Sequence, residues 1–123
     1  MYREIKIENE HLSVIICTLG AEFKSIKKDG RELLWGGDPD VWTGQAPILF
    51  PICGALRDNK YVYEDKEYFL EKHGFARTSE FEVEKADETS AVLLLKPNKE
   101  TQKKYPFDYE FRACFSLEGA SVK

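Results

Sequence analysis

Apolar and polar residues alternate with a period of two along most of this chain, the pattern of β-strands that bury one face. The alternation is clearest over residues 109–117, where one face carries Tyr109, Phe111, Ala113, Phe115 and Leu117. We therefore expect a strand there with that face packed against a core.

The first third of the chain predicts two hairpins. Residues 3–7 and 12–17 read as strands joined through the turn-forming Asn9-Glu10, and residues 22–28 end at Asp29-Gly30, a strong hairpin signal. Residues 32–35 are expected to return as a strand. Asp38 is placed as an N-cap and Pro39 at the first position of one helical turn that reaches Trp42.

The rest of the chain continues the pattern. Residues 60–63 and 66–69 flank Glu64-Asp65 as a tight hairpin with aromatic cross-strand pairs, and residues 80–85 and 91–96 are two further strands. The polar residues 98–105 predict two helical turns, which Pro106 must end. The final residues, 118–123, read as a hairpin turn with a short returning strand.

Nine or ten short strands with almost no helix predict an all-β fold, an antiparallel β-sandwich or barrel. At 123 residues the chain is long enough for a single domain, residues 1–123.

Composition excludes several partners. Apolar residues make up 42% of the chain. The net charge is −4, and acidic and basic residues are mixed along the sequence without forming a basic stripe, so we expect no nucleic-acid partner. The longest apolar stretch, residues 91–95, is far below the roughly 18 residues of a membrane span. We expect a cytoplasmic protein with no membrane partner.

The chain has three cysteines, which lie far apart in the sequence, each among apolar neighbours: Cys17, Cys53 and Cys114. They are interpreted as reduced core thiols in a reducing compartment. Neither they nor the two histidines show metal-ligand spacing, so no metal is expected.

The chemistry-bearing part of the chain is a Pro-rich segment, Gln-Ala-Pro-Ile-Leu-Phe-Pro-Ile-Cys-Gly at residues 45–54, followed by His-Gly-Phe-Ala-Arg at residues 73–77. Pro47 and Pro51 each lack an N–H, so the segment should run extended along an edge or through a structured loop. His73 then lies beside a glycine that lets the backbone bend.

These two motifs resemble the aldose 1-epimerase (galactose mutarotase-like) family, in particular its LacX-like branch, from about Gly20 to about Gly119. The resemblance implies a large antiparallel β-sandwich of the supersandwich type, anomer interconversion of an aldose, a sugar partner and no cofactor. Family members are more than twice this length. We therefore hypothesise that the chain is the N-terminal portion of a longer enzyme, or that it self-associates through an unpaired C-terminal strand, whose large apolar side chains would otherwise be bare.

Anomer interconversion needs one group to take a proton from the anomeric hydroxyl and another to protonate the ring oxygen. Histidine suits such work because its ordinary pKa is about 6.5. By resemblance His73 contacts the sugar as a catalytic-site and substrate-binding residue. The family's general acid, a histidine, and its general base, a glutamate, match nothing here and are expected beyond Lys123. The alternative is a loop histidine that only fixes the turn; His11 is interpreted as a surface residue.

Arg57 and Arg77 are the candidate substrate-binding cations, because a guanidinium offers a planar fork to hydroxyls or a phosphate. Arg77 has an ion pair with Glu80 or Glu82 as its alternative. Many family members carry an arginine directly after the glycine equivalent to Gly54, where this chain has Ala55. If the segment is a strand, Arg57 shares a face with that position and substitutes for it. Recognition of a hexose 6-phosphate is held as an alternative.

Trp35, Trp42 and Phe75 have aromatic faces suited to a pyranose, but core packing is the favoured interpretation for the two tryptophans. Four aspartates are assigned to turns and to no catalytic pair: Asp38, Asp40, Asp58 and Asp65. The rival functions are a non-catalytic carbohydrate-binding β-module and a plain structural domain.

Overall fold

The first sheet is antiparallel, with its strands in chain order. The computed structural model describes residues 2–123. The sheet comprises β1 (Glu4–Glu8), β2 (Leu12–Cys17), β3 (Glu22–Lys28) and β4 (Arg31–Glu32). Both hairpins predicted from the sequence are confirmed. The returning strand expected at residues 32–35 is shorter than predicted and ends at Glu32, whose carboxylate accepts the N–H groups of Ile26 and Leu34.

The second sheet is also antiparallel and has the order β10-β9-β8-β7. Its strands are β7 (Glu82–Ala86), β8 (Ser90–Leu95), β9 (Phe111–Glu118) and β10 (Ser121–Val122). The strand expected to begin at residue 80 begins at Glu82, because residue 80 instead forms an isolated bridge with Leu19.

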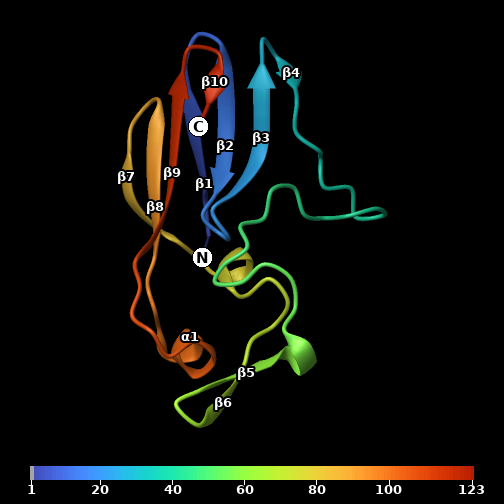
Figure 1. Ribbon diagram of the computed structural model, residues 1–123. Coiled ribbons are helices and arrows are strands. Elements are labelled where there is room, and N and C mark those ends of the chain that lie inside the picture. The colour runs from blue at the N-terminus through green and yellow to red at the C-terminus, as the bar shows by residue number, and fades with distance from the viewer. Residues whose placement is uncertain (1) are drawn as a thin grey trace.

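The two sheets pack face to face, and one hydrophobic core fills the space between them (Figure 1). The first sheet supplies Ile7, Leu12, Val14 and Ile16, and the second supplies Ala91, Leu93, Ala113 and Phe115. Phe23 of β3 meets Phe115 of β9 edge to face at 5.1 Å. The predicted antiparallel β-sandwich is therefore confirmed.

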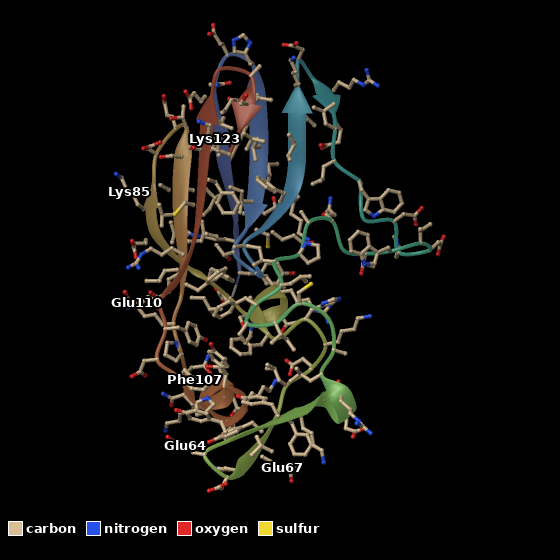
Figure 2. All side chains as sticks on the ribbon, viewed as in Figure 1. Glu64, Glu67, Lys85, Phe107, Glu110 and Lys123 are labelled. Carbon is tan, nitrogen blue, oxygen red and sulfur yellow. The ribbon has the colours of Figure 1, made fainter. Side chains whose placement is uncertain are left out.

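A small hairpin and a short helix lie together beyond one end of the sandwich (Figure 1). The hairpin is β5 (Lys60–Tyr63) with β6 (Lys66–Phe69), and the helix is α1 (Lys99–Lys104). Tyr61 stacks on its cross-strand partner Tyr68 at 5.4 Å and donates its hydroxyl to the carbonyl of Lys104 at 2.6 Å. Figure 2 shows Phe107 near the tip of this hairpin, where its ring lies 4.8 Å from that of Tyr63. The predicted hairpin, aromatic pairing and helical turns are confirmed.

Residues 33–44 form a loop that projects away from the edge of the first sheet (Figure 1). We call it the arm. It contains the predicted helical turn, in which the Trp42 N–H donates to the carbonyl of Asp38. Trp35 and Trp42 are 42% and 52% exposed, so the core packing favoured for them is wrong. The arm does not pack into the core between the sheets. Within the arm, the indole N–H of Trp35 donates to the Trp42 carbonyl.

The cysteines are all free, but only Cys17 is buried. Cys53 and Cys114 are exposed, so the prediction that they are core thiols is wrong. Cys114 falls on the outward face of β9, because its neighbours Ala113 and Phe115 point inward. Within residues 2–123, no helix is both long enough and apolar enough to cross a membrane.

The apolar face of β9 is covered. Phe115 is 8% exposed, and Tyr109, Phe111 and Leu117 pack partly buried against the core. The expectation that these side chains would be bare is therefore wrong, because the facing sheet and the loop around Phe50 cover them: the Phe50 ring stacks on that of Phe111 at 4.4 Å. Self-association through this strand stays a prediction.

Candidate functional site

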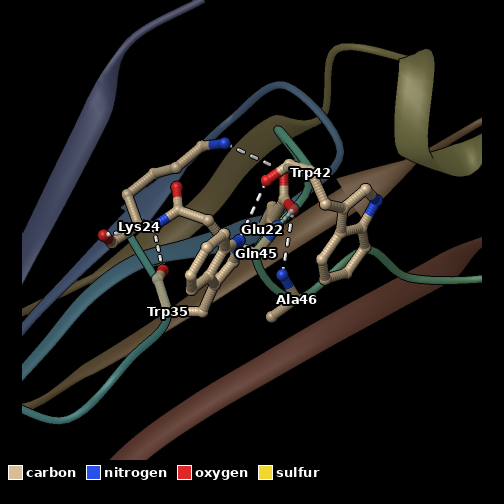
Figure 3. A network of polar contacts seen from close by, with 6 residues as sticks. All are labelled: Glu22, Lys24, Trp35, Trp42, Gln45 and Ala46. Atoms are coloured by element: carbon tan, nitrogen blue, oxygen red, sulfur yellow. Dashed lines mark hydrogen bonds and ion pairs between the residues drawn. The ribbon is translucent and has the colours of Figure 1, made fainter. Parts of the chain in front are cut away.

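The Pro-rich segment is anchored at its beginning by a single carboxylate (Figure 3). Glu22, at the start of β3, accepts the backbone N–H groups of Gln45 and Ala46 at 2.8 and 2.9 Å, and Lys24 donates to its other oxygen. The Gln45 amide in turn donates to the carbonyls of Lys24 and Trp35. Two consecutive residues are thus fixed to the sandwich before the chain enters the prolines.

The Glu22 carboxyl has a lowered pKa. Burial by itself raises the pKa, but the hydrogen bonds from Gln45, Ala46 and Lys24 stabilise the charged form and outweigh it. The carboxylate is therefore ionised at neutral pH and holds the segment as an anion. Sequence reasoning missed this residue, since its partners lie more than twenty positions away.

The far end of the Pro-rich segment is held by the His-Gly-Phe-Ala-Arg motif. The N–H groups of Phe75 and Ala76 both donate to the carbonyl of Phe50, at 3.0 and 3.2 Å. Gly74 has φ +70° and packs directly on Phe50 and Pro51, where a Cβ would overlap the Phe50 carbonyl. The segment is therefore a structured loop, as predicted, and the glycine is required by both its conformation and its contact.

His73 forms a reciprocal pair of hydrogen bonds with Gly54. Its backbone N–H donates to the Gly54 carbonyl at 2.9 Å, and its ring Nδ1 accepts the Gly54 N–H at 2.8 Å. His73 has φ 66°, a left-handed conformation that costs a non-glycine residue about 1–3 kcal/mol. Such strain persists only where surrounding contacts impose it, and these two bonds do so together with the turn closed by Gly74 N–H and the Glu71 carbonyl.

The surroundings of the imidazole leave one ring nitrogen open to a ligand. His73 is half-buried, and within residues 2–123 its Nε2 has no hydrogen-bond partner. Cys53 and Ala55 on either side of Gly54 are exposed, and apart from Gly54 and these two neighbours no atom of residues 2–123 lies within 4 Å of the place where a Gly54 side chain would begin. A hydroxyl-bearing ligand therefore has space beside Gly54, and the neighbouring ring offers a nitrogen with which to hydrogen bond.

Arg77 is the middle residue of η2 (Ala76–Thr78), a 3₁₀ turn that begins at the buried Ala76, directly after the buried Phe75. Its guanidinium Nη2 donates to the carbonyl of Lys72 at 3.1 Å, the carbonyl that precedes His73. The structure thus brings the guanidinium beside the His73 peptide. One nitrogen is used by the loop itself, and the residue is otherwise exposed.

Arg57 is the first residue of η1 (Arg57–Asn59) and is exposed. The idea that residues 55 and 57 share a strand face is wrong, because the chain turns here: Asp58 and Asn59 have φ 55° and 56°. Within residues 2–123 the Arg57 guanidinium has no hydrogen bond or ion pair. Among these residues it is a free cation, three positions from Gly54 in the sequence and not hydrogen bonded to His73.

Phe75 and His11 do not belong to the candidate site. Phe75 is 3% exposed and packs on Phe50 and Tyr105, so it offers no free face to a sugar. His11 is exposed in the β1–β2 turn, as predicted for a surface residue, with Nε2 at 3.4 Å from Glu10.

A recess of about 520 Å³ lies between η2 and α1 and is lined by residues that include Ser79, Lys96 and Thr101. Its lining does not contain His73, Arg57 or Arg77. The candidate site is therefore an open surface beside Gly54 and not this recess.

Comparison with known proteins points to one family. The sequence profile of the family described as Aldose 1-epimerase matches residues 3–123. The chromosomal LacX protein of Lactococcus lactis subsp. lactis is 44% identical over 125 residues, which is 97% of this chain and 42% of that protein. The chain thus spans less than half the length of the curated relatives it matches.

Solved structures agree. A galactose mutarotase related enzyme from Lactobacillus acidophilus has a TM-score of 0.92 at 43% identity, over 94% of this chain and 39% of that one. A galactose mutarotase-like protein from Lactobacillus casei has a TM-score of 0.93 at 34% identity, over 98% and 42%. The sandwich is therefore of the galactose-mutarotase-like type.

Proposed function

The chain belongs to the aldose 1-epimerase family, and from that premise we propose that it supplies the sugar-binding part of an enzyme that interconverts the anomers of an aldose. The main observation in support of this proposal is the His73–Gly54 pair, which fixes an imidazole in a strained loop with Nε2 open to a ligand. Strain maintained by surrounding bonds is common where a residue has a task beyond folding.

In this proposal His73 hydrogen bonds an oxygen of the sugar, close to the anomeric carbon. Arg77 lies in the same loop and has donors beyond the one given to Lys72, because a guanidinium carries five N–H groups. The two side chains together present donors to the oxygens of one pyranose.

The chemistry also needs a general acid and a general base. By the family resemblance these are a histidine and a glutamate that match no residue of this chain, so the proposal assigns it binding and not turnover. One positioned acid or base contributes about 10²–10⁴-fold to a rate. The purified chain should leave mutarotation of fresh glucose or galactose at the buffer rate in polarimetry.

Calorimetric titration of the chain with galactose and with glucose tests the binding role. We expect saturable binding that His73→Ala reduces at least tenfold, with His11→Ala as the matched control that leaves it unchanged. Binding that survives His73→Ala would instead favour a non-catalytic carbohydrate-binding module. The absence of saturable binding in the unsubstituted chain would refute the proposal.

The free Arg57 guanidinium supports a second candidate, recognition of a hexose 6-phosphate, since guanidinium groups bind phosphate strongly. Titration with glucose 6-phosphate distinguishes the two. Tighter binding than glucose, lost in Arg57→Gln, would establish the second candidate, and equal binding would exclude it.

A further inference from the structure

We infer that the peptide N–H of Gly54 acts as a positioning group that holds His73 in the tautomer with its proton on Nε2, so that His73 presents a hydrogen-bond donor and not a proton acceptor. The part of this inference that concerns the sugar rests on the proposed function. The part that concerns the tautomer rests on the contacts of the loop alone.

The tautomer follows from the direction of one hydrogen bond. A backbone N–H can only donate, so the Nδ1 that lies 2.8 Å from the Gly54 nitrogen must be an acceptor without a proton. In a neutral imidazole the proton is then on Nε2. The second bond, from the His73 N–H to the Gly54 carbonyl, sets the distance between the two segments and keeps the Gly54 N–H within reach of Nδ1.

The two segments that form this pair are also joined to each other and to the sandwich at further points. Glu22 fixes the segment that leads to Gly54 at Gln45 and Ala46, and the N–H groups of Phe75 and Ala76, just after His73, donate to the carbonyl of Phe50 in that same segment. The N–H of Gly54 is therefore presented to the ring by the fold.

This tautomer limits what His73 can do in the reaction. A neutral imidazole with Nε2–H donates to a sugar oxygen, and its only acceptor nitrogen is already used by Gly54. His73 therefore cannot remove the proton of the anomeric hydroxyl while this bond exists. It stabilises negative charge that develops on a sugar oxygen, and proton removal belongs to another group.

Nitrogen-15 NMR of the imidazole in the free chain tests the tautomer directly. At a pH about two units above the ordinary histidine pKa of about 6.5, we expect the His73 spectrum to show an unprotonated Nδ1 and a protonated Nε2. His11→Gln assigns the signals, because it removes the other histidine of the chain. A protonated Nδ1, or a rapidly exchanging mixture of both tautomers, would overturn the inference whether or not a sugar binds.

Two substitutions separate the roles of the ring nitrogens. Asparagine at this position places Oδ1 where Nδ1 lies, so His73→Asn should keep the Gly54 amide protected from hydrogen exchange while raising the sugar dissociation constant at least tenfold. His73→Ala should lose both the protection and the affinity. His73→Asn that binds sugar as tightly as the unsubstituted chain would refute the donor role, and an unprotected Gly54 amide in the unsubstituted chain would refute the positioning role. If the unsubstituted chain binds no sugar, the proposed function fails and the NMR spectrum still decides the tautomer.

Discussion

Gly74 packs against another segment so closely that a side chain would overlap the carbonyl of Phe50, and it also has φ +70°. We expect Gly74→Ala to lower the free energy of unfolding by about 3 kcal/mol or more, because it combines a strained conformation with a backbone overlap.

Gly119 is the matched control for this substitution. It has φ +59°, and apart from Gly119 and its two chain neighbours no atom of residues 2–123 lies within 4 Å of the Cβ position, so Gly119→Ala should cost only the conformational strain of about 1–2 kcal/mol. Urea unfolding measures both variants. Equal losses would show that the close contact at Gly74 does not exist.

Glu22 provides a pH-dependent test of the anchor on the Pro-rich segment. Because its pKa in the folded chain is lowered from 4.5, its contribution to stability is present above that value and is lost as the pH falls through the lowered pKa. Glu22→Gln should cost about 1–2 kcal/mol at pH about 7, where charged hydrogen bonds are replaced by neutral ones. This difference should shrink below pH 4.5.

The control for Glu22 is Glu10→Gln, since the Glu10 side chain is 85% exposed and lies 3.4 Å from Nε2 of His11 at the surface. Its effect should be near zero at both pH values. A Glu22→Gln penalty that stays constant on acidification would contradict the assignment of an ionised anchor.

The sequence was enough to predict which residues form the candidate site, but not the contacts that these residues make. The motif pointed to His73 and Arg77, but the tautomer of His73 depends on Gly54, nineteen positions away, and the Arg77 contact on the carbonyl of Lys72. Such contacts depend on how two loops pack against each other, and the local sequence of either loop does not predict that packing.

At the scale of elements, helix α1 is short and depends on its cap. The Asn98 side chain accepts the Thr101 N–H at 2.9 Å, and the Thr101 hydroxyl accepts the Asn98 N–H, also at 2.9 Å. Asn98→Ala should lower the free energy of unfolding by about 1 kcal/mol. Gln102→Ala, at an exposed position of the same helix, should be neutral or slightly stabilising. Urea unfolding in which the two variants behave alike would show that the cap contributes nothing.

Helices and strands that are determined by their local sequence were predicted with bounds at or near the observed ones. The bounds of elements that depend on tertiary contacts were not predicted correctly. The β5–β6 hairpin has the predicted bounds because Glu64 and Asp65 accept positive φ in a tight turn. The strand after Gly30 is shorter than predicted, because Glu32 turns its carboxylate back onto β3.

At the scale of the whole molecule, both tryptophans of the chain lie on the exposed arm, so their fluorescence reports on that loop alone. Acrylamide should quench both efficiently at low protein concentration. The packing preference of large aromatics predicted the opposite, and it failed because the arm leaves the sheets instead of crossing the core.

Self-association can be assigned to a surface with the same probe. Sedimentation velocity at increasing concentration measures whether the chain associates. If association uses the C-terminal strand, tryptophan quenching should stay constant as the chain associates. Quenching that falls with association would place the contact on the arm, and a monomer at all concentrations would contradict the prediction of self-association.

Amide NMR during titration with galactose tests most directly whether a sugar lies beside the Gly54–His73 pair. We expect the cross-peaks of Gly54, His73 and Arg77 to shift in a saturable manner, while those of Gly30 and Gly119, in hairpin turns elsewhere, stay in place. Saturable shifts confined to other segments, or none at any galactose concentration, would contradict the proposed sugar site.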